Sequence, residues 1–352
     1  MRIDMDKLID DKEVRRLAEL LPRVSRVVVT CHMRPDGDAI GSCLGTMHLL
    51  RQLGKEVTVV VPDQPPRSLA FLPGFRDIAI NTQHEEYVRN VIGEAELLIC
   101  CDFNKPSRQG RLEEVVQCAS CPKVMIDHHQ QPDDFADITF SYPEMSSACE
   151  VAFRVYAALG LYLDMNLDCA TCLLTGMVTD TRNFAVNVKN PDIYEILVKL
   201  LEKGADKTRI VKEALETRSY WSLKLEAYTL AEKMEILERH HASVTTLCKE
   251  ELERFHYQKG DTEGIVNKPL EIRGVIYSFF LRQDDDCVKV SARSVRNFPV
   301  SKICEDLFGG GGHIMAAGAE FQGTLEECRR ILIEALPSYD RYLPRQMDAV
   351  DI

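Results

Sequence analysis

Short apolar runs alternate with longer helical patterns through the first half of the chain. From about Ala39 to Leu53 the apolar positions repeat with helical spacing, and Gly54 is placed to end that helix. Continuous apolar strands separated by helices are typical of a parallel sheet that is covered on both faces. The predicted strands are Val27–Thr30, Val57–Val61, Leu97–Cys100 and Val124–Ile126.

The middle of the chain is predicted to be helical. Ser147 and Glu150 have the spacing of a capping box, which predicts a helix that starts there and ends near Gly160. A second helix is expected from Asp168 to Asp180. The following stretch, from about Pro191 to Arg239, is rich in Leu, Glu and Lys with few helix breakers, so it predicts two or three linking helices.

The last hundred or so residues change to a strand-rich pattern. Strands are expected at Glu271–Leu281 and Cys287–Arg293, with a turn at 283–286 between them. Residues 288–293 alternate between apolar and polar side chains, as in a strand with one buried face. A helix over Val300–Leu307, a glycine loop at 309–312, a strand and a terminal helix follow. The predicted organisation is a parallel-sheet α/β domain with helices on both faces (1–190), a helical linker (191–240) and a smaller α/β domain (241–345).

Composition and charge narrow the classes of function. The chain has 352 residues, 45% hydrophobic and 28% charged, which fits a globular protein with two domains. Its formal net charge of −12 argues against a protein that coats long duplex nucleic acid, because such binding depends on Lys and Arg neutralising phosphates. A short oligonucleotide or a nucleotide remains a possible ligand, since metal ions can supply the positive charge.

The placement of the cysteines and the hydropathy of the chain indicate the cellular compartment. The 13 cysteines have no disulfide framework spacing, and several, such as Cys100 and Cys101, lie in apolar runs. Buried reduced thiols fit this pattern better than disulfides, so we expect a reducing cytoplasm. The first residues contain no apolar signal core, and no window approaches the roughly 18 uncharged apolar residues of a membrane span. We therefore expect no membrane partner.

Acidic and histidine side chains follow three of the predicted strands directly. His32, Asp36 and Asp38 come after the first strand, Asp102 after the third, and Asp127-His128-His129 closes the fourth. Open α/β sheets build their sites at the carboxyl ends of the strands, so these side chains are expected to converge. Asp180 ends a predicted helix and is a further candidate. The set predicts one metal site lined by carboxylates and imidazoles.

Each of these acidic or histidine residues, taken alone, has a simpler structural interpretation. An Asp after a strand is usually a turn or cap residue, and a His pair is more often a surface feature. The two CxxC pairs, Cys118/Cys121 and Cys169/Cys172, have the spacing of zinc ligands. The second pair lies in an apolar helix, however, where burial of one face gives the same spacing. We therefore favour the carboxylate–histidine site.

These segments resemble the DHH phosphoesterase family. The resemblance rests on His32 with Pro35-Asp36-Gly37-Asp38, on Asp102, on Asp127-His128-His129 and on Asp180, which occur in the family's order. In the second half, Gly309–His313 followed by Ala316-Ala317-Gly318 resembles the signature of the DHH-associated domain. The resemblance thus extends over both predicted domains.

The resemblance implies two manganese ions, for which magnesium or cobalt are possible substitutes. Sites rich in carboxylate with some imidazole and no thiolate suit manganese independently of the resemblance. By position, one ion would be held by His32, Asp36 and Asp102. The other would be held by Asp38, Asp102, His128 and Asp180, with Asp102 as the bridge.

The resemblance also implies a mechanism. Two metals about 3.5–4 Å apart would activate a bridging water and hold the phosphoryl oxygens during in-line attack. Asp102 and His129 would be the catalytic residues, with His129 at the phosphate or the leaving oxygen, while Asp127 would orient a ligand. Arg293, His313 and the backbone of Gly310, Gly311 and Gly312 would bind the substrate.

Several substrates stay open at this point. The chain resembles the compact members that degrade very short RNAs and dephosphorylate 3′-phosphoadenosine 5′-phosphate, so we expect an oligoribonuclease and nucleotide phosphatase. The alternative is a phosphodiesterase of cyclic di-AMP or of its linear product. A RecJ-like exonuclease for single-stranded DNA, a pyrophosphatase and a catalytically silent nucleotide sensor are less favoured. For the oligomeric state, a homodimer is the common case.

Overall fold

The computed structural model describes residues 8–188, 190–345 and 348–351. Contacts within the chain divide it into two compact units, with the boundary between Thr217 and Arg218. Each unit contains its own six-stranded sheet. Among the described residues no helix is long and apolar enough to span a membrane.

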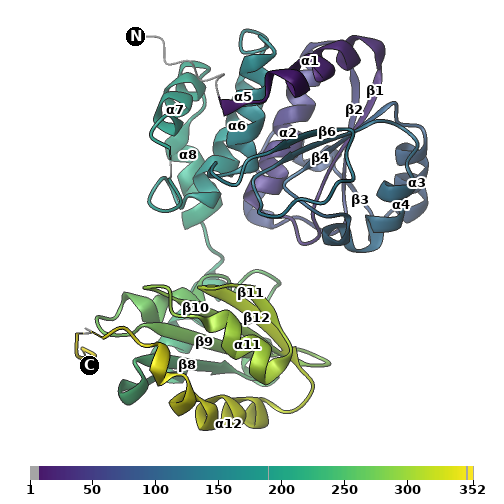
Figure 1. Cartoon of the computed structure of the whole chain (residues 1–352). Coiled ribbons are helices and arrows are strands. Elements are labelled where there is room, and N and C mark those ends of the chain that lie inside the picture. The colour runs from purple at the N-terminus through teal and green to yellow at the C-terminus, as the bar shows by residue number, and fades with distance from the viewer. Residues whose placement is uncertain (1–7, 189, 346–347, 352) are drawn as a thin grey trace. The chain divides into compact units, whose positions relative to one another are not determined.

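The first unit is built on a sheet whose strands all run parallel (Figure 1). The strand order is β3-β2-β1-β4-β5-β6. The central strands are buried almost throughout, which is why they are continuous apolar runs in the sequence. The predicted α/β fold is confirmed. The strands are β1 (Arg26–Cys31), β2 (Glu56–Val61), β3 (Ala79–Ile80), β4 (Leu97–Cys101), β5 (Lys123–Asp127) and β6 (Ile138–Ser141).

Helices cover both faces of this sheet (Figure 1). On one face, α3 and α4 pack through Val88, Ile92 and Val116 against Val28 and Leu98. The opposite face is covered by a larger apolar cluster that includes α1, α2, α5 and α6. The helices of the unit are α1 (Asp11–Leu20), α2 (Gly37–Gln52), α3 (Glu85–Gly93), α4 (Glu113–Cys118), α5 (Ala148–Ala158), α6 (Leu167–Asp180), α7 (Ile193–Glu202) and α8 (Lys207–Val211).

The strand order determines where side chains can converge. After β1 the chain moves to β2 on one side, whereas β4 lies on the other side of β1, so the order reverses between β1 and β4. Cys31 and Cys101, the last residues of these two strands, are paired in register. The residues that follow them therefore begin side by side. In open α/β sheets this switch point is where ligands bind.

A row of glycines lets α2 pack closely against α6. Gly37, Gly41 and Gly45 recur every four residues, so they lie on one face of α2. A Cβ on Gly41 would lie 2.6 Å from the carbonyl oxygen of Cys172, and one on Gly37 would lie 2.4 Å from Oγ1 of Thr179. The close crossing brings the start of α2 next to the end of α6.

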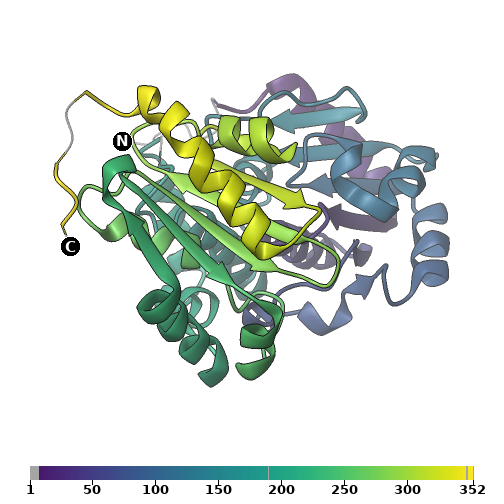
Figure 2. The ribbon, with the colours of Figure 1, turned by 90° about the horizontal axis from the view of Figure 1, so that it is seen from below.

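The second unit is a mixed sheet in the order β11-β12-β10-β9-β8-β7. Figure 2 shows α11 and α12 on one of its faces, where they share an apolar cluster with the sheet. In β10 the predicted alternation of buried and less buried side chains is confirmed. The elements are α9 (Tyr220–Tyr228), β7 (Met234–Leu237), β8 (Ala242–Leu247), α10 (Lys249–Arg254), β9 (Tyr277–Gln283), β10 (Val288–Ser294), α11 (Val300–Phe308), β11 (Gly311–His313), β12 (Ala316–Phe321) and α12 (Leu325–Ala335).

Three local predictions need correction. The strand expected from Glu271 begins only at Tyr277, because a 3-10 helix covers 265–271 and Gly274 has a left-handed φ of 87° that interrupts an extended chain. The glycine run is not an open loop, since Gly311–His313 forms strand β11 against β12. The stretch expected to be purely helical up to Arg239 ends in strand β7, because Met234–Leu237 pairs with β8.

Candidate metal centre

Four chain segments deliver polar side chains to the carboxyl end of the parallel sheet. His32 follows β1 directly, and Asp102 follows β4 directly. Asp127 is the last residue of β5, so His128 comes next to the same edge. Asp180 does not follow a strand but is the last residue of helix α6.

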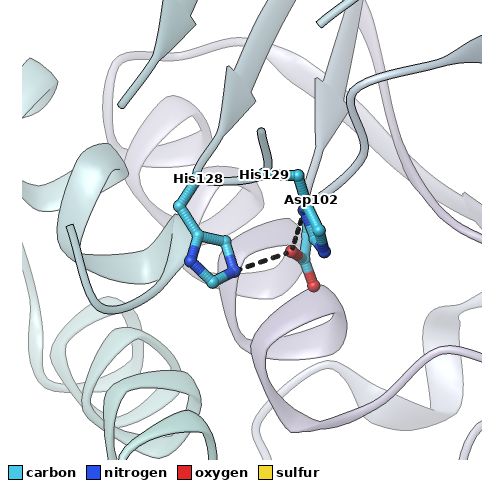
Figure 3. A group of neighbouring side chains, drawn as sticks. All are labelled: Asp102, His128 and His129. Carbon is cyan, nitrogen blue, oxygen red and sulfur yellow. Dashed lines mark ion pairs between the residues drawn. The ribbon is translucent and has the colours of Figure 1, made fainter. Parts of the chain in front are cut away.

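The buried carboxylate of Asp102 lies at the centre of this arrangement (Figure 3). Its Oδ2 lies 3.3 Å from Nε2 of His32, while its Oδ1 lies 3.5 Å from Nε2 of His128. Nδ1 of His129 is 3.6 Å from the same Oδ1. The two oxygens of one carboxylate therefore face two different histidines. Oδ1 accepts no hydrogen bond although it is buried, which leaves it available to a cation.

Two further groups of ligand atoms complete the centre on either side of Asp102. On one side, Asp36 Oδ2 lies 3.9 Å from Nε2 of His32. On the other, Nε2 of His128 lies 3.8 Å from Asp38 Oδ2 and 3.4 Å from Asp180 Oδ2. In each of the following sets the ligand atoms all lie within 4.8 Å of one another: His32, Asp36 and Asp102; Asp38, His128 and Asp180; Asp102, His128 and His129.

Neighbouring backbone groups orient these ligands. Nδ1 of His32 lies 2.7 Å from the carbonyl oxygen of Met33, so Nδ1–H donates there and Nε2 is the ring nitrogen that faces the centre. Asp36 caps α2, because its Oδ1 accepts from the N–H groups of Asp38 and Ala39 at 3.0 Å. Its Oδ2 remains free to face His32.

Asp127 holds the side chain of His129 in one orientation through hydrogen bonds. Its Oδ1 lies 2.8 Å from Nδ1 of His129, and its Oδ2 accepts the backbone N–H of His129 at 2.8 Å. The Asp127 side chain is fully buried, so this pair of bonds fixes the ring. With Nδ1–H donated to the carboxylate, Nε2 of His129 is left for a different partner.

Burial and charge raise the pKa values of most titratable groups in the centre and lower that of Asp102. Burial disfavours the charged form of His32 and His128, but the attraction of Asp102 outweighs it and raises the pKa of each to about 10. Burial together with the neighbouring Asp102 raises the pKa of Asp38 to about 7 and that of Asp180 well above its usual range. Burial would also raise the pKa of Asp102, yet His128 and His32 hold it below its usual range.

Left-handed backbone occurs in each loop of the centre. Arg34, Asp102 and Arg182 have φ values of 54°, 61° and 45°, which non-glycine residues rarely adopt. Arg34 lies between His32 and Asp36, and Arg182 lies two residues after Asp180. Such strain persists only where the surrounding structure holds it, and it concentrates at functional sites.

The residues fit two divalent cations. Four carboxylates gather here with three imidazoles, and oxygen donors with some imidazole nitrogen suit divalent cations such as manganese. Oδ1 of Asp102, which accepts no hydrogen bond, and Nε2 of His32, which lies 3.3 Å from Asp102 Oδ2, both face the centre. Among the described residues no group of this kind includes a cysteine, so neither CxxC pair forms the zinc cluster that its spacing allows.

In the second unit, Arg293 and His313 lie in one row of the sheet. Ala316 of β12 pairs with Arg293 of β10 on one side and with His313 of β11 on the other. Residues directly opposite one another point to the same face, so these two side chains share a face although twenty positions separate them in sequence. Arg293 Nη1 donates to the carbonyl oxygen of Ala292 at 2.9 Å.

The glycines before His313 are explained by backbone contact with β12. A Cβ on Gly310 would lie 2.2 Å from the carbonyl oxygen of Gly318, and one on Gly312 would lie 2.5 Å from that of Ala316. Nearby basic residues are engaged elsewhere, since Arg282 and Lys289 both pair with Asp284. Arg293 and His313, the phosphate candidates predicted from the sequence, lie on this face of the sheet.

Sequence patterns alone did not identify the residues that hold Asp38. Its Oδ2 accepts the backbone N–H of Ala148 at 2.6 Å, and its Oδ1 accepts that of Cys149 at 3.0 Å. Ser147 caps the same helix as predicted, but Glu150 bonds Ser146 and Arg154 instead of completing the capping box. The capping pattern located the helix start, whereas nothing in the sequence indicates which carboxylate would meet it.

Comparison with known proteins agrees with this geometry. Residues 26–177 match the DHH family, N-terminal domain, and residues 243–338 match the DHHA1 domain. The bifunctional oligoribonuclease and PAP phosphatase NrnA of Thermus thermophilus is 30% identical over 92% of this chain and 94% of its own length. This chain belongs to the DHH family. As a family member it is a phosphoesterase, an enzyme that hydrolyses ester bonds.

Two other proteins are similar to this DHH-family chain over most of its length. An exopolyphosphatase-related protein of Bacteroides fragilis is 39% identical, with a TM-score of 0.92 over 95% of this chain and 98% of that one. The cyclic-di-AMP phosphodiesterase PdeA of Listeria monocytogenes is 28% identical over 92% of this chain but only 49% of its own length.

Proposed function

We propose that this DHH phosphoesterase hydrolyses short oligoribonucleotides from one end and removes a phosphate from 3′-phosphoadenosine 5′-phosphate, with two manganese ions as cofactor. The observation that carries the proposal is the position of Asp102, whose two oxygens face His32 on one side and His128 on the other. Such a carboxylate suits a bridge between two cations.

The donor set supports manganese. His32, Asp36 and Asp102 would hold one ion, and Asp38, Asp102, His128 and Asp180 would hold the other. Carboxylate oxygens with some imidazole nitrogen suit manganese, and magnesium or cobalt are the expected substitutes. When bound, two such ions supply an acidified water and positive charge for the phosphoryl oxygens.

The protein's own residues supply positioning and a proton. Asp127 fixes the ring of His129, so that Nε2 is presented to a substrate oxygen and can protonate the leaving group. We assign Arg293 and His313 to the recognition of substrate phosphate, because they share one face of the second sheet. Gly310 and Gly312 let the backbone next to His313 lie close to β12, and Gly311 pairs with Gly318 of that strand.

The substrate class is supported by the NrnA relative, which matches both units over nearly its whole length. Hydrolysis of cyclic di-AMP or linear di-adenylate is the second candidate, since the PdeA relative covers the same part of this chain. The absence of disulfides among the thirteen cysteines, most of them buried, fits a reducing compartment, and we propose the cytoplasm.

A substrate panel with added manganese tests the proposal. We expect turnover of di- to pentaribonucleotides and of 3′-phosphoadenosine 5′-phosphate that exceeds turnover of cyclic di-AMP, long single-stranded DNA and pyrophosphate. A preference for cyclic di-AMP would favour the second candidate. Retained nucleotide binding without any release of mononucleotide would contradict an active enzyme.

Asp102→Ala tests the bridging role within the same panel. The substitution removes an atom that both ion sites require, so we expect activity to be abolished while the far-ultraviolet circular dichroism stays unchanged. Near-normal turnover by Asp102→Ala would show that the bridging assignment is wrong.

A further inference from the structure

We propose that helix α5 is the positioning element of the metal centre, acting on Asp38 through its first two N–H groups, and that Ser147 and Glu150 control the centre through this helix. The inference rests on the proposed function in one respect, because it takes Asp38 as a ligand of one of the two ions.

The contact between Asp38 and the helix uses both carboxylate oxygens. The N–H groups of Ala148 and Cys149 donate to Oδ2 and Oδ1 at 2.6 and 3.0 Å, and the Asp38 side chain is fully buried. Two such bonds fix the plane of the carboxylate. They also direct the lone pairs that remain, because Oδ2 lies 3.8 Å from His128 Nε2 on the other side.

The first turn of α5 is itself held in place by hydrogen bonds of the side chains at its start. Ser147 is the N-cap, and its Oγ accepts the N–H of Glu150 at 3.0 Å. Glu150 Oε2 accepts from the N–H and the hydroxyl of Ser146 at 2.9 and 2.7 Å. Glu150 Oε1 accepts from Nε and Nη2 of Arg154 at 3.0 and 2.7 Å.

The buried pair between Glu150 and Arg154 is better explained by positioning than by stability. Both side chains are at most 1% exposed. Removing two charges from water costs free energy that their attraction only about repays, so such a pair adds little net stability over an apolar one. It does hold Ser146, and thereby the chain that enters α5, in one geometry. The helix can then present its N–H groups to Asp38 without adjustment.

Ser147→Ala tests this role through metal binding instead of turnover. Without the hydroxyl the first turn loses its cap, and the N–H groups of Ala148 and Cys149 are no longer held against Asp38. Titration of the metal-free protein with manganese should show one of the two ions bound about 10- to 100-fold more weakly, with the other retained. Ser147→Thr restores a capping hydroxyl and should restore the affinity.

Thr324→Ala is a matched control in the second unit. Thr324 also caps a helix that has Glu at its third position, and its Oγ1 accepts the N–H of Glu327. This variant loses the same kind of bond at a helix of the other unit, which contains none of the proposed metal ligands, so both manganese affinities should stay at the wild-type value. A loss equal to that of Ser147→Ala would overturn the inference.

A double-mutant cycle with Asp38→Ala shows whether Ser147 affects manganese binding through Asp38. If Ser147 acts through Asp38, adding Ser147→Ala to Asp38→Ala should change manganese affinity no further. An additional loss, or wild-type affinity in a folded Ser147→Ala protein, overturns the inference. Should Ser147→Ala not fold, Ser147→Gly removes the hydroxyl at less cost to the helix and gives the same readout. Manganese binding by a wild-type protein that hydrolyses nothing would instead contradict the proposed function.

Discussion

Nδ1 of His129 lies 2.8 Å from Oδ1 of Asp127, and the backbone N–H of His129 donates to the other oxygen of the same carboxylate. Asp127→Asn replaces one acceptor with an amide donor, so it breaks one of these two bonds. We expect kcat to fall about 10- to 100-fold while the number of bound ions is unchanged. Steady-state kinetics with metal analysis checks this. Asp134→Asn, at an exposed position of the following loop, should have no effect.

Metal binding should release protons from His32 and His128, and also from the carboxyl groups of Asp38 and Asp180, whose pKa values are raised by burial. In the metal-free protein the pKa of each imidazole is raised to about 10, so both carry a proton at pH 7, and a cation binds only the neutral form. The apparent affinity should therefore increase with pH up to about 10, at most about tenfold per unit for each proton released. Calorimetry in buffers of different ionisation enthalpy counts these protons. A pH-independent affinity would contradict the prediction, and His128→Gln should release one proton fewer.

Gly176→Ala should disturb both packing and the centre. A Cβ there would lie 2.3 Å from Sγ of Cys149 and 2.6 Å from Oδ1 of Asp38, so those atoms must move. Overpacking of this kind typically costs about 1–3 kcal/mol, which urea unfolding can measure. Gly93→Ala is the control, because a Cβ on Gly93 meets no atom within 4 Å and its φ is not left-handed. That variant should be neutral or slightly more stable; a similar loss in both would show that the contacts around Gly176 are not the cause.

Arg154→Met should leave the carboxylate of Glu150 buried without its partner. Breaking a buried ion pair on one side typically costs about 3–5 kcal/mol of unfolding free energy. Adding Glu150→Gln removes the unpaired charge and keeps an oxygen for the N–H of Ser146, so the double variant should recover most of the loss. Chemical denaturation of the three proteins measures this, and a double variant no more stable than Arg154→Met would refute the explanation.

The central sheet could be predicted because its strands are buried on both faces and therefore form uninterrupted apolar runs. The edge strands could not. β3 has only two residues, and β6 is half-buried, with Thr139 between Ile138 and Phe140. Left-handed Gly274 explains the late start of β9, and a Cβ at this position would lie 2.5 Å from the carbonyl oxygen of Ala349, a residue far along the chain.

The candidate site was predictable to the extent that it follows strand ends. Asp102 and His128 come directly after apolar strands, and parallel strands bring such positions together without further information. The orientation of each ligand was not predictable, since it depends on contacts between distant segments. Asp38 meets the start of α5 over a separation of about 110 positions, and the spacing of Ser147 and Glu150 shows only that a helix starts there.

The left-handed backbone at Asp102 limits which residues evolution or a designer can place there. Aspartate, asparagine and histidine are the polar residues that adopt this conformation most readily, so the longer carboxylate of glutamate is disfavoured by its backbone as well as by its reach. A saturation library at position 102 should therefore yield aspartate when selected for turnover and mainly aspartate, asparagine and glycine when selected for folding. Asparagine at this position would give an inactive protein of native shape, suited to capturing an uncleaved substrate for structure determination.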